Sequence, residues 1–245
     1  AYSLLAFGLS AGYHAMATGS AAGTTLGAEV TLTAALYDCD EEALAFLPEG
    51  SEEAYVLGNT LKIAEQNGWT ASAATGGVIA QYRHYESHYD ELRMEYLQQL
   101  SNYYGTGDYH DLPSSVLAQS ARRYAVLLPR LIGNCFPQYV RTRLINALAG
   151  VVRANSIMSL PGVLLSAAVY LVGAVFLFLT RRKEAYADAR LLMKGTLLFI
   201  GLNALFCCFG VFALSRYMYY NFPLIYLALL LFVCVFFREH KREKT

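Results

Sequence analysis

Charge of either sign is missing from three long runs in the last third of this chain. Leu160–Thr180 (LPGVLLSAAVYLVGAVFLFLT) and Gly195–Leu214 contain no charged residue, and neither does Tyr217–Phe237, which has three tyrosines near its start. Runs of this kind are typical of helices that cross about 30 Å of hydrocarbon, and tyrosines suit the headgroup layer. Three buried helices of a soluble protein are the alternative, although such helices rarely reach this length without a polar face.

Catalytic and nucleotide-binding motifs are also missing. The chain has no P-loop and no GxGxxG, HExxH or CxxC pattern, so nothing supports phosphoryl transfer from a bound nucleotide, and we expect no cofactor. The formal net charge is zero, which gives no support to a nucleic-acid partner. Acidic pairs such as Asp90–Glu91 are interpreted as solvated helix surface.

Strand signals are absent as well. There is no sustained apolar alternation, no hairpin turn signal, no internal repeat and no low-complexity tract. Helix signals are frequent: Ser51 precedes two acids, Gly68 can end that helix, and Pro113 and Pro137 open later ones. The predicted fold class is an all-α integral membrane protein, with a helical extracytoplasmic domain followed by three transmembrane helices.

Basic residues concentrate in two short segments, 181–194 and 238–245, which two predicted crossings separate. The positive-inside rule makes both cytoplasmic. The predicted domains are therefore a helical extracytoplasmic domain at 13–157, three transmembrane helices at 158–237 and a basic cytoplasmic tail at 238–245. The predicted location is the inner membrane of a bacterial cell, crossed more than once.

The first twenty residues carry no charge, and the chain shows no starting Met and no basic region of a signal peptide. We expect residues 1–12 to be the end of a membrane helix that begins upstream. The alternative is a mature N-terminus that packs as an ordinary helix.

The stretch QYRHYESHYDELRMEYLQQL, residues 81–100, repeats tyrosine at helical spacing. The positions that follow one another at three or four residues are Val78, Tyr82, Tyr85, Tyr89, Leu92, Tyr96, Leu100 and Tyr103. This spacing predicts a helix over 78–104 with a coiled-coil type of seam, in which each tyrosine buries its ring. The same Tyr-rich helix is the candidate surface for a helical protein partner.

His84, His88 and Glu91 lie beside this seam at the same spacing. Two histidines four residues apart on a helix can share a metal ion, and Glu91 lies on the same face. A single helix rarely supplies three ligands, so we favour no metal site here. The alternative interpretation is a solvated flank with a local His–Glu hydrogen bond.

Residues 113–156 contain six arginines but no lysine and no acid, whereas Asp38–Glu53 is acidic and has no base. The helix that starts at Pro137 has an apolar side and is expected to lie on the outer membrane surface. There, Arg141, Arg143 and Arg153 would contact lipid phosphate, for which the guanidinium fork is suited. The alternative is pairing of these arginines with the acidic segment inside the domain, together with ordinary headgroup contact.

Cysteines divide by location. Cys207, Cys208 and Cys234 fall within predicted spans and are interpreted as small apolar residues. Cys39 and Cys135 are the two in the predicted outer domain, where an oxidising compartment would allow a disulfide between them.

The segment RYMYYNFPLIYL (Arg216–Leu227) resembles the entry to the last helix of bacterial multi-spanning glycosyltransferases of the GT-C type, which use polyprenyl-phosphate sugars. The helix that begins Pro137-Gln138-Tyr139-Val140 is similar to their membrane-surface helices. The resemblance implies that Arg216 contacts the phosphate of a lipid-linked sugar; an interface anchor is the plain alternative. The family's catalytic Asp lies in an early outer loop, so its role falls on no residue of this chain.

Two functions follow as expectations. The first is the C-terminal portion of a multi-pass envelope protein that acts, like a glycosyltransferase, on lipid-linked glycan, with membrane lipid as its other partner. The alternative is a non-enzymatic, membrane-anchored domain outside the cytoplasm for interaction or sensing. A transporter is a third hypothesis, which the absence of charge within the spans weakens. Whether the protein is an enzyme stays open.

Overall fold

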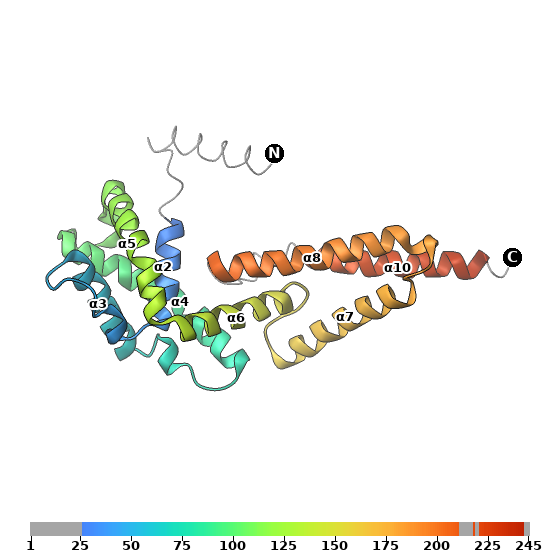
Figure 1. The fold of residues 1–245 in the computed structure, drawn as a ribbon, viewed down its shortest axis with the longest axis horizontal. Coiled ribbons are helices and arrows are strands. Elements are labelled where there is room, and N and C mark those ends of the chain that lie inside the picture. The colour runs from blue at the N-terminus through green and yellow to red at the C-terminus, as the bar shows by residue number, and fades with distance from the viewer. Residues whose placement is uncertain (1–25, 211–217, 219–220, 243–245) are drawn as a thin grey trace. The chain divides into compact units, whose positions relative to one another are not determined.

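The computed structural model describes residues 26–210, Met218 and residues 221–242, and these are helical without any strand (Figure 1). The predicted end of an upstream helix at 1–12 lies outside them. The α-helices are α2 (Leu26–Asp38), α3 (Glu52–Gln66), α4 (Val78–Tyr104), α5 (Ser114–Asn134), α6 (Phe136–Arg153), α7 (Leu160–Leu179), α8 (Ala187–Gly210) and α10 (Phe222–Arg242). Short 3-10 turns are η1 (Glu41–Leu44), η2 (Ala71–Ala73), η3 (Tyr109–Asp111) and η4 (Glu184–Tyr186).

Helix α3 begins and ends as the sequence predicts. The Ser51 side chain accepts a hydrogen bond from the Ala54 amide at 3.1 Å, which satisfies one of the free N–H groups of the first turn. Gly68 follows the last turn with a φ of +70°, a left-handed conformation that glycine adopts without strain.

The chain divides into two compact units. The N-terminal unit comprises residues up to 73 and 87–139, and the span-containing unit comprises 74–86 and residues from 140 onward. This division follows packing, whereas the predicted boundary at 157/158 follows hydropathy, so that boundary stays a prediction.

The tyrosine seam of α4 is buried, as its spacing predicts. Six of its eight positions are at most 3% exposed, and only the two ends, Val78 and Tyr103, are open, at 46% and 43%. In the N-terminal unit, Tyr96 packs edge-on against Tyr124 of α5, with ring centroids 5.6 Å apart, and the Tyr89 hydroxyl donates to the carbonyl of Val30. A partner helix on α4 stays a prediction. Because the seam positions are already buried within the chain, such a partner would have to contact another face of α4.

Three helices are long and apolar enough to cross a membrane: Leu160–Leu179, Glu184–Cys208 and Phe222–Lys241. The second begins earlier than the predicted span at Gly195, because residues 187–194 of the expected basic loop are already helical. At most 28% of any of the three apolar windows is buried inside the chain. These helices therefore do not form a buried core within the described residues.

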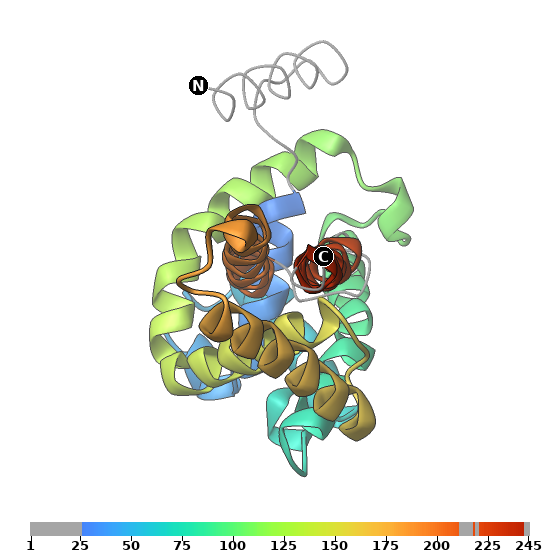
Figure 2. The same ribbon diagram turned by 90° about the vertical axis from the view of Figure 1, so that its right-hand side faces the viewer.

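Two aromatic side chains join the spans inside the span-containing unit. Phe232 of α10 is fully buried and stacks on Phe176 of α7, with ring centroids 5.3 Å apart. Met193 of α8 lies in the same apolar cluster, and α8 and α10 run alongside each other (Figure 1 and Figure 2). A Cβ at Gly173 of α7 would lie 3.4 Å from the Met193 sulfur, an ordinary van der Waals contact, so α7 and α8 pack closely at this point.

Tyrosine hydroxyls cap the carboxyl end of α6. Tyr170 of α7 donates to the Val151 carbonyl at 2.7 Å, and Tyr226 of α10 donates to the Asn155 carbonyl at 3.2 Å. The last carbonyls of a helix have no partner within the helix. The two spans therefore satisfy groups that α6 cannot satisfy itself.

Arginines cap the next two helix ends in the same unit. Arg190 of α8 donates to the carbonyls of Thr180 and Lys183, just after α7. Arg143 of α6 donates to the Cys208 carbonyl in the last turn of α8, at 3.3 Å. A cation at a helix carboxyl end is also favoured by the helix dipole.

Replacing Gly162 by alanine is expected to destabilise the span-containing unit by about 1–3 kcal/mol, a typical cost of overpacking. A Cβ at this position in the first turn of α7 would lie 2.0 Å from the Ile157 carbonyl oxygen. Gly201→Ala in α8 is the matched control, because its Cβ would meet nothing within 4 Å. Thermal unfolding in detergent compares the two, and equal midpoints would contradict the close approach at Gly162.

Candidate functional site

A groove with a volume of about 540 Å³ lies on the N-terminal unit, lined by η1, the turn that follows it and α3. Local signals build its walls. Asp40 caps η1 by accepting from the Ala43 amide at 3.0 Å, and Gly50 turns the chain with a φ of +75° before Ser51 starts α3. The lining residues are Glu41, Leu44, Ala45, Glu49, Gly50, Ala54, Tyr55, Gly58, Asn59 and Lys62.

The groove is acidic at its margin. Between Asp40 and Gln66 the exposed charged side chains are one base, Lys62, and five acids: Asp40, Glu41, Glu42, Glu49 and Glu65. Partial desolvation raises the pKa of the Glu65 carboxyl, and the charges of Glu41 and Asp40 raise it further. The five carboxylates therefore produce a negative potential beside the groove.

An exposed aromatic ring adds an apolar surface to the groove. Tyr55 is 44% exposed and contacts Tyr103 of α4, with ring centroids 5.6 Å apart. Gly58 lies on the same helix face three residues later, and a Cβ there would meet nothing within 4 Å. The groove thus combines carboxylates, one aromatic face and open space over a helix.

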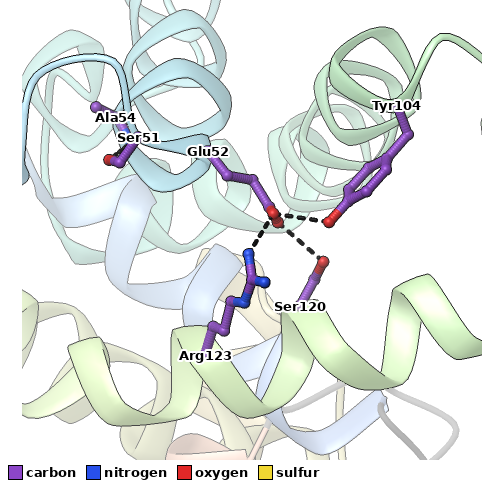
Figure 3. A network of polar contacts seen from close by, with 6 residues as sticks. All are labelled: Ser51, Glu52, Ala54, Tyr104, Ser120 and Arg123. Atoms are coloured by element: carbon purple, nitrogen blue, oxygen red, sulfur yellow. Dashed lines mark hydrogen bonds and ion pairs between the residues drawn. The ribbon is translucent and has the colours of Figure 1, made fainter.

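A buried carboxylate lies near the start of the same helix (Figure 3). Glu52, only 5% exposed, accepts hydrogen bonds from Tyr104, Ser120 and Arg123, with oxygen and nitrogen atoms 2.7, 3.1 and 2.6 Å away. The three donors come from α4 and α5, so Glu52 links three helices. With three donors on its two oxygens, this carboxylate is a structural junction.

The tyrosines near this junction stay protonated at ordinary pH. Burial raises the pKa of the Tyr104 phenol, and its hydrogen bond to Glu52 raises it further. Burial also raises the pKa of Tyr96 and Tyr124 far above the usual range. A phenol in this state donates hydrogen bonds and does not act as a base.

The arginines predicted to contact lipid phosphate occupy different environments. Arg141 is exposed. Arg143 is 2% exposed, donates to Cys208 and lies 5.0 Å from the Tyr85 ring centroid. Arg153 pairs with Glu86 at 2.7 Å and lies over the Tyr82 ring. Cation–π contacts and an ion pair within the span-containing unit thus occupy two of the three guanidinium groups.

Within residues 113–156, Arg123 pairs with the acidic segment, because it binds Glu52. Arg130 makes a different contact and lies over the ring of Phe46, 4.5 Å from its centroid. Contact of Arg141, Arg143 or Arg153 with lipid phosphate stays a prediction. Arg216, the residue implied by the glycosyltransferase resemblance, lies outside the described residues, and its role also stays a prediction.

His84 and His88 are half-buried on α4, and Glu91 is exposed. Within residues 26–210, Met218 and 221–242, no three or more His, Cys, Asp or Glu side chains are grouped as metal ligands. His84 belongs to the span-containing unit and His88 to the N-terminal unit.

The structure brings the predicted cysteine pair together. The sulfur atoms of Cys39 and Cys135 lie 2.9 Å apart, although 96 positions separate them in the sequence. Both side chains are buried, and the two thiols are free. The other cysteines, Cys207, Cys208 and Cys234, lie on α8 and α10.

Sequence reasoning missed the groove and the role of Glu52. The acids after Ser51 predict a helix start but not that one of them is buried while its neighbour Glu53 is half-exposed. The acidic segment itself was a visible signal of the groove margin.

No family model, curated protein or solved structure matches this chain.

Proposed function

We propose that this chain is a membrane-anchored binding protein of the bacterial envelope, whose N-terminal unit holds a cationic segment of a partner protein outside the cytoplasm. The observation that carries the proposal is the acidic groove between η1 and α3. In this proposal the three apolar helices anchor the protein, and the basic tail faces the cytoplasm.

Exposed apolar faces on the three helices support the membrane anchor. Leu164, Leu171, Leu198 and Phe206 are each exposed by 63% or more, and Leu230 by 57%. Contiguous apolar surface of this kind is costly in water, whereas hydrocarbon covers it without cost. The carboxyl ends of α6, α7 and α8 accept hydrogen bonds from neighbouring side chains, which also suits a membrane environment.

Charge and shape support a cationic partner. Exposed ion pairs contribute about 0.2–1 kcal/mol each, and a cation over an exposed tyrosine contributes about 0.5–1 kcal/mol. Two or three such contacts contribute at most about 3 kcal/mol, so with apolar burial over Gly58 we expect an affinity of about millimolar order that salt weakens. A lysine or arginine side chain over Tyr55, with its charge beside Glu41 or Glu49, meets these conditions.

The test is a titration of the detergent-solubilised protein with a fluorescent lysine–alanine peptide, followed by anisotropy. The double variant Glu41→Lys/Glu49→Lys is expected to lower the affinity at least tenfold, since two favourable contacts become repulsive. Glu91→Lys, a charge reversal at an exposed position of α4, is the matched control and should leave the affinity almost unchanged. Equal losses in both variants, or equal binding of a glutamate–alanine peptide, would reject the groove as the binding site.

A second variant tests the shape of the groove separately from its charge. Gly58→Leu should fill the groove and abolish peptide binding without changing any charge. Leucine favours a helix by about 0.8 kcal/mol over glycine, so this variant should unfold at the same temperature as the original chain or higher. Full binding by a stable Gly58→Leu protein would contradict a role for the groove itself.

A further inference from the structure

Two buried thiols meet where segments far apart in the sequence converge. Cys39 follows the last turn of α2, and its amide donates to the Leu36 carbonyl at 3.2 Å. Cys135 lies between α5 and α6, and its amide donates to the Leu131 carbonyl at 3.3 Å. Helix-end hydrogen bonds therefore hold both residues in place, with 6% and 8% of their surfaces exposed.

We propose that Cys39 and Cys135 are joined by a disulfide in the mature protein, formed by exchange with a disulfide-bearing oxidant outside the cytoplasm. The two cysteines give up two protons and two electrons as their sulfur–sulfur bond forms. The oxidant's disulfide takes them up and leaves as a dithiol. The proposal takes from the proposed function only the placement of the N-terminal unit outside the cytoplasm.

Geometry supports the bond. A disulfide needs its sulfur atoms about 2.05 Å apart, and these atoms lie 2.9 Å apart, so closure needs a movement of less than about 1 Å. The segments are already joined nearby, because the Asn134 amide group donates to the Ala43 carbonyl at 2.9 Å. Oxidation would thus add a covalent link to a contact that already exists.

The chemistry of the buried thiol also fixes when the bond forms. The contact with the Cys135 thiol and burial together raise the pKa of Cys39 far above its usual range. Exchange requires a thiolate, which the folded, reduced protein therefore hardly provides. The bond forms while the N-terminal unit folds, and the closed bond is shielded from reductants afterwards.

The disulfide would hold one wall of the groove. Cys39 is followed directly by Asp40, which caps η1, and η1 supplies Glu41 and Leu44 to the groove. The link therefore fixes η1 to the junction of α5 and α6. Its effect on peptide binding rests on the proposed function, whereas the bond itself does not.

Peptide mapping of the full protein, isolated from bacterial membranes with N-ethylmaleimide present throughout, tests the bond. Cleavage after Glu, Lys and Arg releases residues 30–41 with Cys39 and residues 131–141 with Cys135. These two peptides are expected as one linked species that separates on reduction. Cys207, Cys208 and Cys234 are expected to carry the maleimide after denaturation without reduction. Maleimide on Cys39 and Cys135 before any reduction would overturn the proposal.

The double variant Cys39→Ala/Cys135→Ala is the control for the linked species, which must disappear. The same variant separates this proposal from the proposed function. A linked wild-type pair without any binding of the lysine–alanine peptide overturns the binding function alone. Peptide binding by a wild-type protein that lacks the link overturns the disulfide alone. If the link is present, the variant is expected to bind the peptide several-fold more weakly, and unchanged binding overturns its role in holding the groove wall.

Discussion

Replacing Glu52 by alanine is expected to lower the free energy of unfolding of the N-terminal unit by about 2–3 kcal/mol. Three donors lose their acceptor at once. Arg123 is 42% exposed at its side chain and can turn to water, as Tyr104 can, but Ser120 is 1% exposed and cannot. The buried hydroxyl and the lost link between three helices account for most of the cost.

Trp69 provides the measurement, because it is the one tryptophan of the chain and lies in the N-terminal unit. Its fluorescence during urea unfolding reports on that unit in the intact protein. Glu53→Ala, at the half-exposed neighbouring position, removes the same charge from the same helix turn and should cost less than about 1 kcal/mol. Glu52→Gln keeps the shape and should fall between the two. If Glu53→Ala destabilises as much as Glu52→Ala, the network is not what stabilises this region.

Much of the fold follows from short-range signals. Ser51 before two acids and Gly68 after the last turn predicted α3, and the tyrosine spacing predicted α4 with its buried seam. Uncharged length predicted three helices that can span a membrane, although α8 begins earlier than expected. Such signals act within a few residues of each other, so sequence alone shows them.

The candidate site depends on long-range proximity, which local patterns do not contain. Glu52 and Arg123 are 71 positions apart, and their pairing depends on how α3 packs beside α5. The groove exists because η1 and α3 leave open space over Gly58, a property of packing rather than of any motif. For the same reason, the sequence alone does not show whether Cys39 and Cys135 lie close together.

The arginine stretch shows the same limit in its chemistry. A guanidinium group suits a phosphate, a carboxylate, an aromatic face or a helix end, so residue type alone does not select among them. For Arg143 the structure supplies a helix end and the Tyr85 ring, and for Arg153 it supplies Glu86 and the Tyr82 ring. The sequence predicts that this helix presents the arginines to the membrane surface, and that contact stays a prediction.

Replacing Arg143 by alanine is expected to destabilise the span-containing unit by about 3–5 kcal/mol, since it removes a large buried side chain and a charged hydrogen-bond donor together. The change leaves a cavity beside Tyr85 and removes the donor to the Cys208 carbonyl. At about 2–4 °C per kcal/mol, the unfolding midpoint should fall by at least about 6 °C.

In a background where the other four cysteines are replaced by alanine, a thiol-reactive fluorogenic maleimide reads this opening where it occurs, because Cys208 itself is 1% exposed. Arg141→Ala is the matched control, since Arg141 is exposed two residues earlier on the same helix, and it should shift the midpoint by less than about 2 °C. Arg143→Met, which keeps volume but not the donor, should recover part of the loss. If Arg141→Ala lowered the midpoint in lipid vesicles as much as Arg143→Ala does, headgroup contact rather than the helix end would be the role of this face.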